Sequence, residues 1–235
     1  MENLLEKTLA MIVKENSKAA SVFEKYELDF CCKGKRTLLT ACEQKGLNAR
    51  GVEADLKTVL ASDTTETFGF PFEKLPPADL CDYIVKTHHH YVREELPRIL
   101  SYAQKVATKH GDRYPYLKEL LLLAEELHNE LMPHLLKEET VLFPLIKKLD
   151  TPKAGITESL GAEKRFIKNP IAVMEREHDR ASELMAAIRH ITDQYQAPPG
   201  ACTTFRLLYD SLHRFEMDLH KHVHLENNVL FQQYE

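Results

Sequence analysis

Residues 220–231 read HKHVHLENNVLF, in which histidines at 220, 222 and 224 are followed by Glu226. In a β-strand these four side chains would share one face, whereas in a helix only His222 and Glu226 point the same way. The preceding apolar residues recur at spacings of three and four and are Phe205, Leu208, Leu212, Phe215 and Leu219. His222, Glu226 and Val229 continue this helical spacing. We therefore predict a helix whose apolar stripe carries His222 and Glu226 into the core, with His220 and His224 pointing elsewhere.

The same pattern occurs earlier in the chain. Residues 134–143, HLLKEETVLF, share H-x-x-x-E-x-x-V-L-F with residues 222–231. The stripe of this second segment comprises Leu117, Leu120, Ala124, Leu127, Leu131, His134, Glu138, Val141 and Leu145. Pro133 precedes His134, where a helix interior disfavours proline, so we expect a kink or a helix restart there.

Two further segments each place one histidine on an apolar stripe. The first has Val85, His89, Val92, Leu96, Ile99, Ala103 and Val106, and the third has Ile171, Met174, His178, Ala181, Met185 and Ile188. The intervals from His89 to His134, then to His178 and to His222, are 45, 44 and 44 residues. An antiparallel bundle returns to one level after about 20 residues each way, in arms of roughly 30 Å. We predict an all-α fold in which residues 78–235 form an antiparallel four-helix bundle.

His110 also continues the first stripe, but it lies 21 residues beyond His89. On one helix that separation is roughly 30 Å. We therefore place His110 at the end of the bundle and exclude it from the histidine group.

The first 62 residues contain no histidine and predict a small helical domain. Asn16 or Ser17 is expected to cap a helix that reaches Tyr26, and Thr37 to cap one that stops at Gly46. A third helix is expected over residues 52–60. Residues 63–77 are rich in proline and lack periodicity, which is typical of a linker.

Composition narrows the classes of function. The chain has 235 residues and a net charge of -5, which gives no electrostatic footprint for nucleic acid or an anionic membrane. No apolar run is long enough to span a membrane, and the first residues lack a signal-peptide pattern, so we expect a cytoplasmic protein. The chain is expected to be a monomer or a homodimer.

Six polar residues should thus meet at one depth inside the bundle: His89, His134, Glu138, His178, His222 and Glu226. Buried imidazoles and carboxylates are costly unless hydrogen-bonded, paired or bound to metal. Six ligands are too many for one tetrahedral zinc, and imidazole disfavours calcium and magnesium. We predict two non-haem iron ions, each held by two histidines, with Glu138 and Glu226 and an oxo or hydroxo group as bridges.

Other polar residues near these positions are ambiguous. Glu139 and Asp179 adjoin predicted ligands, where they could orient an imidazole or simply be exposed. Glu175 lies one position off the stripe and is expected to be solvated. Six histidines off the stripes are expected on outer faces: His88, His90, His128, His213, His220 and His224.

Cys31 and Cys32 are adjacent in a segment that also carries Lys33, Lys35 and Arg36. Positive neighbours lower the pKa of a thiol and favour the reactive thiolate. A zinc site is not expected, because this part of the chain has only three cysteines and no histidine. The residues alone leave a reactive pair and a pair of small half-buried fillers equally open. We expect Cys42, Cys81 and Cys202 to be structural.

The order of the six predicted ligands resembles that of the hemerythrin-like domain. Residues 29–38, DFCCKGKRTL, resemble the CCxGxxTL signature of a small domain joined to such bundles. Together with EHD at 177–179 and HLENN at 224–228, these motifs resemble the family of iron–sulfur cluster repair di-iron proteins over essentially the whole chain.

This resemblance implies repair of iron–sulfur clusters damaged by nitrosative or oxidative stress, by supplying iron to client proteins. Reduction of nitric oxide at the di-iron centre is the alternative, and a module that senses oxygen or iron is a third reading. The resemblance also favours Cys31 and Cys32 as a relay for iron, sulfur or nitric oxide. Oxygen-carrying hemerythrins have a further histidine where this chain has Ser182, which favours a labile or reactive centre.

Overall fold

The computed structural model describes residues 3–16, 18–61, 72–150 and 157–234. Its regular elements in this part of the chain are all helical, and the only strand-like pairing is one isolated bridge between Thr8 and Thr37. The all-α prediction is confirmed. The chain divides into two compact units, Met1–Pro76 with Val223–Gln233 and Pro77–His222 with Tyr234.

The N-terminal part of the first unit consists of short helices. A 3-10 turn, η1 (Leu4–Glu6), precedes α1 (Leu9–Glu15), α2 (Ala19–Lys25), α3 (Leu38–Gln44) and α4 (Ala49–Ala61). Thr37 caps α3 as predicted, because its hydroxyl accepts a hydrogen bond from the Thr40 amide at 3.2 Å. Asn16 accepts from the Lys18 amide just before α2, whereas Ser17 lies outside the described residues.

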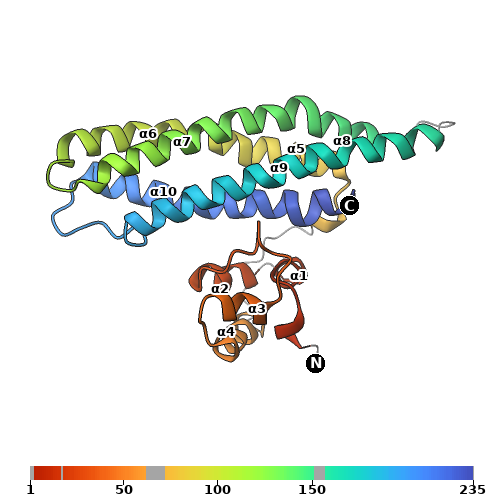
Figure 1. The fold of residues 1–235 in the computed structure, drawn as a ribbon, viewed down its shortest axis with the longest axis horizontal. Coiled ribbons are helices and arrows are strands. Elements are labelled where there is room, and N and C mark those ends of the chain that lie inside the picture. Colours follow the sequence, from red (N-terminus) through yellow and green to blue (C-terminus); the bar gives the residue numbers. More distant parts are fainter. Residues whose placement is uncertain (1–2, 17, 62–71, 151–156, 235) are drawn as a thin grey trace. The chain divides into compact units, whose positions relative to one another are not determined.

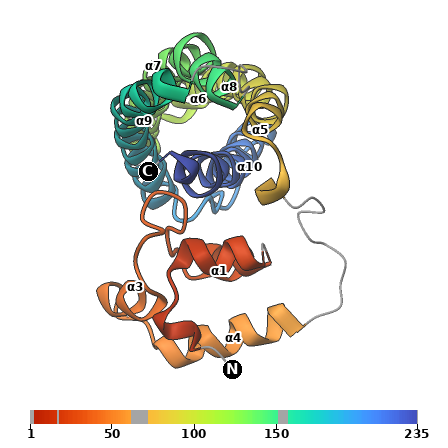
Figure 2. The ribbon, with the colours of Figure 1, turned by 90° about the vertical axis from the view of Figure 1, so that its right-hand side faces the viewer.

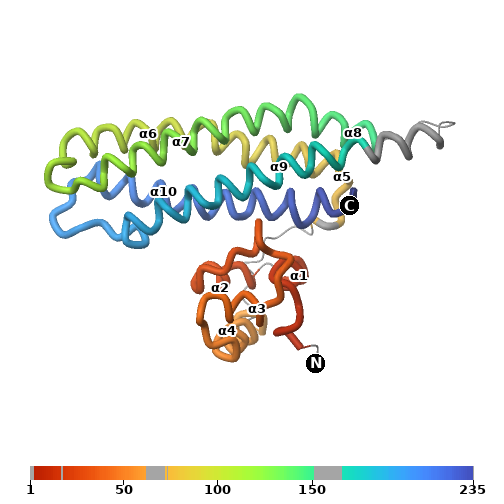
Figure 3. The backbone as a smooth tube through the Cα atoms, viewed as in Figure 1, coloured from red at the N-terminus to blue at the C-terminus, as the bar shows by residue number. Residues whose placement is uncertain are grey.

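Four antiparallel arms build the bundle (Figure 1). The first joins α5 (Pro77–Ile84), η3 (Val85–His89) and α6 (His90–His110), and the second joins α7 (Tyr116–Lys137), η4 (Glu138–Leu142) and α8 (Phe143–Asp150). The third is α9 (Thr157–Ile191), and the fourth joins α10 (Thr203–Leu225), η5 (Glu226–Leu230) and η6 (Phe231–Gln233). Figure 3 traces the arms as they run back and forth along the long axis of the bundle, and Figure 2 shows them end-on.

The linker prediction falls largely outside the described residues, which resume with a 3-10 turn, η2 (Phe72–Lys74), before α5. None of the described helices combines the length and apolar character needed to cross a membrane.

Within the described residues, three arms contain one π-helical turn each, namely η3, η4 and η5. A π turn adds one residue to a helical turn and so rotates the subsequent residues by roughly 100° about the helix axis. Such turns are frequent at functional sites because they redirect side chains. Each of these three carries a predicted ligand at one end: His89, Glu138 and Glu226.

The π turn in the second arm overturns part of the predicted stripe. Val141 was expected in the core but is 57% exposed. The buried residues of this arm after Glu138 are instead Leu142, Phe143, Ile146 and Leu149. The sequence pattern assumed a uniform period of 3.6 residues, and the extra residue in η4 shifts the stripe by one position.

Of the kink or helix restart expected at Pro133, the restart is not found. The helix α7 runs without interruption from Tyr116 to Lys137 with Pro133 inside it. His134 therefore follows in register with Leu127 and Leu131, which are buried on the same stripe. The continuity of α7 is what brings His134 to the core despite the proline.

Candidate metal centre

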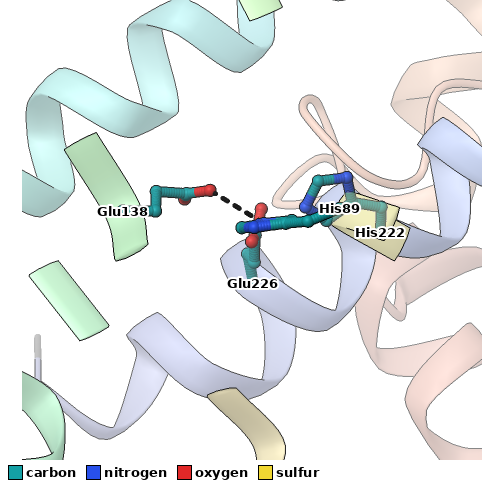
Figure 4. A group of neighbouring side chains, drawn as sticks. All are labelled: His89, Glu138, His222 and Glu226. Carbon is teal, nitrogen blue, oxygen red and sulfur yellow. Dashed lines mark ion pairs between the residues drawn. The ribbon is translucent and has the colours of Figure 1, made fainter. Parts of the chain in front are cut away.

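All six predicted ligands come together in the core of the bundle. They form two overlapping groups in which the potential ligand atoms lie within 4.8 Å of one another: His89, Glu138, His222 and Glu226, and His134, Glu138, His178 and Glu226. Figure 4 shows the first group, with Glu138 and Glu226 pointing toward the two imidazoles. Both glutamates belong to both groups, so each would contact a cation bound in either of them.

The helices deliver these side chains in pairs. His134 with Glu138, and His222 with Glu226, are four residues apart and so project from one face of their arms. His89 ends η3, and His178 comes from the uninterrupted helix α9. All six side chains are at most 2% exposed, so the site excludes bulk water.

Distances within the groups fit a metal site. Nε2 of His89 and Nε2 of His134 lie 3.3 Å and 3.4 Å from Oε2 of Glu138. Nε2 of His134 and Nε2 of His178 are 3.0 Å apart. Two metal–nitrogen bonds of about 2.1 Å meeting at a right angle would separate the nitrogens by about 3.0 Å. The imidazoles therefore converge as ligands of a shared ion do.

The clearest sign that the site takes a cation is the carboxylate of Glu138. Both of its oxygens are buried, and neither has a hydrogen-bond partner in the described part of the chain. A buried carboxylate without donors is costly, and a bound cation removes that cost. Imidazole and carboxylate together suit iron, zinc or manganese better than calcium or magnesium.

Two carboxylates outside the groups orient the histidines. Nδ1 of His89 donates to Oε1 of Glu139 at 2.7 Å, and Arg93 pairs with the same oxygen at 2.8 Å. Each histidine whose Nδ1 carries the proton presents the lone pair of Nε2 to the centre, as a metal ligand requires. Glu139 thus takes the orienting role that the sequence left undecided.

Glu177 does the same for His134. Oε2 of Glu177 accepts from Nδ1 of His134 at 2.9 Å, and Lys137 pairs with Oε1 at 2.5 Å. The hydrogen bond from His134, aided by Lys137 and opposed by burial, lowers the pKa of Glu177 to about 2. Burial raises the pKa of Glu139, but its bonds to Arg93 and His89 outweigh burial and leave that pKa below the ordinary value. Both carboxylates are therefore charged at neutral pH.

Sequence reasoning missed Glu177. The sequence pattern pointed to Asp179, two residues further on, and Asp179 is exposed. One signal was available, because Glu139 and Glu177 are each adjacent to a predicted ligand in the sequence. Each of them orients a histidine of another arm, a relation that a single helical stripe cannot reveal.

Two of the six histidines expected on outer faces are buried. His88 is 4% exposed, and its Nδ1 lies 3.0 Å from Asp218, while its ring stacks on that of His222. His224 is 8% exposed and packs its ring edge against Phe30. The other four lie at exposed or half-exposed positions, namely His90, His128, His213 and His220. His88 is buried because it lies in the π turn η3, and His224 is buried because it packs against Phe30.

Three other residues lie outside both groups. Glu175 and Ser182 are half-buried on α9 and contribute no atom to either group. His110 ends α6, where its Nε2 lies 3.3 Å from the sulfur of Cys202. Of the cysteines expected to be structural, Cys42 and Cys81 are buried and Cys202 is half-buried.

The orienting role of Glu139 predicts a loss of affinity without a loss of ligands. Glu139→Gln should lower iron affinity by about 10- to 100-fold, because a neutral amide holds the His89 tautomer less firmly. The measurement is iron retention against a competing chelator, with Asp179→Asn as the matched control. Equal retention in wild type and both variants would contradict this role.

The cysteine pair lies in the first unit. Cys31 is 3% exposed and Cys32 is half-buried. The expected lowering of the thiol pKa is wrong for Cys31: its contact with Cys32, its burial and the nearby Asp29 raise that pKa well above the ordinary value. The lysines do not offset these effects, since Lys33 and Lys35 are exposed.

Comparison with known proteins agrees with both parts of this architecture. Residues 82–234 match the hemerythrin HHE cation binding domain, and residues 5–60 match ScdA_N, a domain of unknown function. The chain is 38% identical over 214 residues to iron–sulfur cluster repair protein YtfE of Citrobacter koseri and to that of Escherichia coli. Each alignment covers 91% of this chain and 90% of the relative.

Proposed function

Because this chain belongs to the hemerythrin HHE family, in the form found in iron–sulfur cluster repair proteins, we propose that it holds two irons and supplies iron to damaged clusters. The observation that carries the proposal is the pair of overlapping groups that share Glu138 and Glu226. A protein that donates iron needs a site that binds the ion selectively and still releases it.

Two ions account for the ligand set better than one. Six protein ligands divide into two histidines for each ion and two shared carboxylates, the arrangement in which bundle cores hold iron pairs. A single ion would leave part of this buried polar set without a charge partner. His89 and His222 would hold one iron, and His134 and His178 the other.

The ligand count favours a labile centre. Two histidines and two shared carboxylates give four protein bonds to each iron, fewer than the six of an octahedral site. Ser182, one turn after His178, does not add an imidazole. The protein residues thus hold and orient the irons without saturating them, which suits exchange with a client.

The state of the cysteines bears on where in the cell this activity takes place. All five cysteines are free, as expected in a reducing compartment, which supports a cytoplasmic location. Its partners would be proteins whose iron–sulfur clusters are damaged by nitric oxide or by oxidants. Nitric oxide or oxygen would reach the irons as small ligands.

The test is repair of a client cluster in a purified system. An iron–sulfur enzyme inactivated by nitric oxide is incubated with iron-loaded protein, with metal-free protein or with an equal amount of free Fe(II). We expect recovery of client activity only with the iron-loaded protein, accompanied by loss of iron from it. Nitrous oxide formation without transfer of iron to the client would instead favour nitric oxide reduction.

A further inference from the structure

The cysteine loop of the first unit contains a second group of metal-ligand type. Potential ligand atoms of Asp29, Cys31 and Cys32 lie within 4.8 Å of one another. The sulfurs of Cys31 and Cys32 are 3.8 Å apart, and the sulfur of Cys31 is 3.3 Å from Oδ1 of Asp29. The three side chains therefore converge on one point within a run of four residues.

This spacing matches that of a tetrahedral thiolate site. Two metal–sulfur bonds of about 2.3 Å at a tetrahedral angle separate the sulfurs by about 3.8 Å. A sulfur and a carboxylate oxygen bound to the same ion are separated by about 3.5 Å. The loop therefore already has the donor separations that a bound ion would impose.

The backbone of the loop is fixed from two sides. Oδ1 of Asp29 accepts hydrogen bonds from the amides of Cys31 at 3.2 Å and Cys32 at 2.9 Å. On the other side, the amide of Asn228 donates to the carbonyl oxygen of Cys31 at 3.1 Å. Asn228 belongs to the same unit and follows Glu226 by two residues. The thiols are thus held by a rigid loop rather than by a mobile tail.

Gly34 shows how closely this loop is packed. A Cβ atom there would lie 2.2 Å from the carbonyl oxygen of Phe30 and 2.9 Å from Cβ of Ala10. A side chain would displace the peptide that leads into Cys31. The glycine therefore permits the conformation that brings the three donors together.

We propose that Asp29, Cys31 and Cys32 form an open binding site for one Fe(II) ion in transit. Binding would convert both thiols to thiolates and release two protons, with no change in the oxidation state of iron or sulfur. Three protein ligands leave a fourth position open, and the half-buried Cys32 and Asp29 give access to it. The choice of Fe(II) as the cargo rests on the proposed function.

The chemistry of the donor atoms supports reversible binding of the ion. Thiolates select thiophilic ions such as Fe(II), Zn(II) and Co(II) over magnesium and calcium. Among the described residues three side chains converge here, so a bound ion would keep an open position through which it can leave. A permanent structural site would be closed by a fourth protein ligand.

The test uses Co(II) as a spectroscopic probe of the full-length, iron-loaded protein without oxygen. We expect one Co(II) per chain to bind with a thiolate-to-cobalt charge-transfer band, and Fe(II) to displace it. Cys32→Ser should abolish the band, and Asp29→Asn should weaken binding by at least about tenfold. Cys202→Ser, which removes another half-buried thiol, should change neither.

Two results would overturn the proposal: a cobalt spectrum without the charge-transfer band, or a band that survives in Cys32→Ser. Failure of Fe(II) to displace Co(II) would overturn the assignment to iron. Cys32 is used because it is more exposed than Cys31, so its replacement should preserve the fold. The iron content of the bundle and the repair of the client cluster are measured on the same samples. These two measurements distinguish failure of this site from failure of the proposed function.

Discussion

Replacing Glu138 with alanine is expected to reduce bound iron from about two ions per chain to less than one. The reason is that Glu138 belongs to both ligand groups, so its loss removes one bond from each ion at once. Replacing one histidine should weaken binding mainly at one of the two ions, because each histidine belongs to only one group. Iron analysis of the purified proteins, together with their optical spectra, measures the effect.

The matched control for this experiment is Glu175→Ala. Glu175 is a half-buried glutamate close to His178 in sequence, yet it lies outside both groups. Its replacement should leave the iron content unchanged. Two irons retained by Glu138→Ala would mean that Glu138 does not bridge, and the assignment of the ligands would have to be abandoned.

Removal of the metal is expected to destabilise the bundle strongly. An ion held at a thousandfold excess over its dissociation constant stabilises the folded state by about 4.1 kcal/mol, so two ions contribute about 8 kcal/mol. For a chain of this size we expect the melting temperature of the bundle to fall by more than about 10 °C. Calorimetry of the iron-loaded and chelator-treated protein tests this, and equal melting temperatures would refute it.

Replacing Glu138 should change the stability of the metal-free protein and of the iron-loaded protein in opposite directions. In the metal-free protein this carboxylate is buried and makes no hydrogen bond among the described residues, although Nε2 of His89 and of His134 lie 3.3 Å and 3.4 Å from it. While those imidazoles are neutral, Glu138→Met should stabilise that form by about 1–3 kcal/mol. In iron-containing buffer the same variant should be less stable than wild type, because it cannot bridge. A variant less stable than wild type in both buffers would show that Glu138 has a structural role instead.

The spacing of residues in the sequence was sufficient to predict the main features of the bundle. A helical period and intervals of 44 and 45 residues brought His89, His134, His178 and His222 to one level, and the i, i+4 relation added Glu138 and Glu226. Six side chains that lie at one level and face the core can meet in only a few ways, because each helix turns only its buried face toward the core. This is why the two groups in the structure contain the six residues predicted.

The π turns were beyond the reach of the sequence pattern. Hydrophobic periodicity averages over several turns, whereas one extra residue in η4 changes which side chains face inward from that point on. Val141 therefore moved outward and Leu142 inward. The error was confined to the residues after the turn, since the stripe before Glu138 was assigned correctly.

The sequence by itself thus determined the all-α class, the level of the centre and the residues that meet there. Only the tertiary structure decided which side chains of different arms touch, such as Glu177 with His134 and Asp218 with His88. It also showed that the contact with Cys32, burial and Asp29 raise the pKa of Cys31, where neighbouring lysines had suggested the opposite. The physical reason is that periodicity specifies a face of one helix, whereas contacts and desolvation depend on the rotation and stagger of its neighbours.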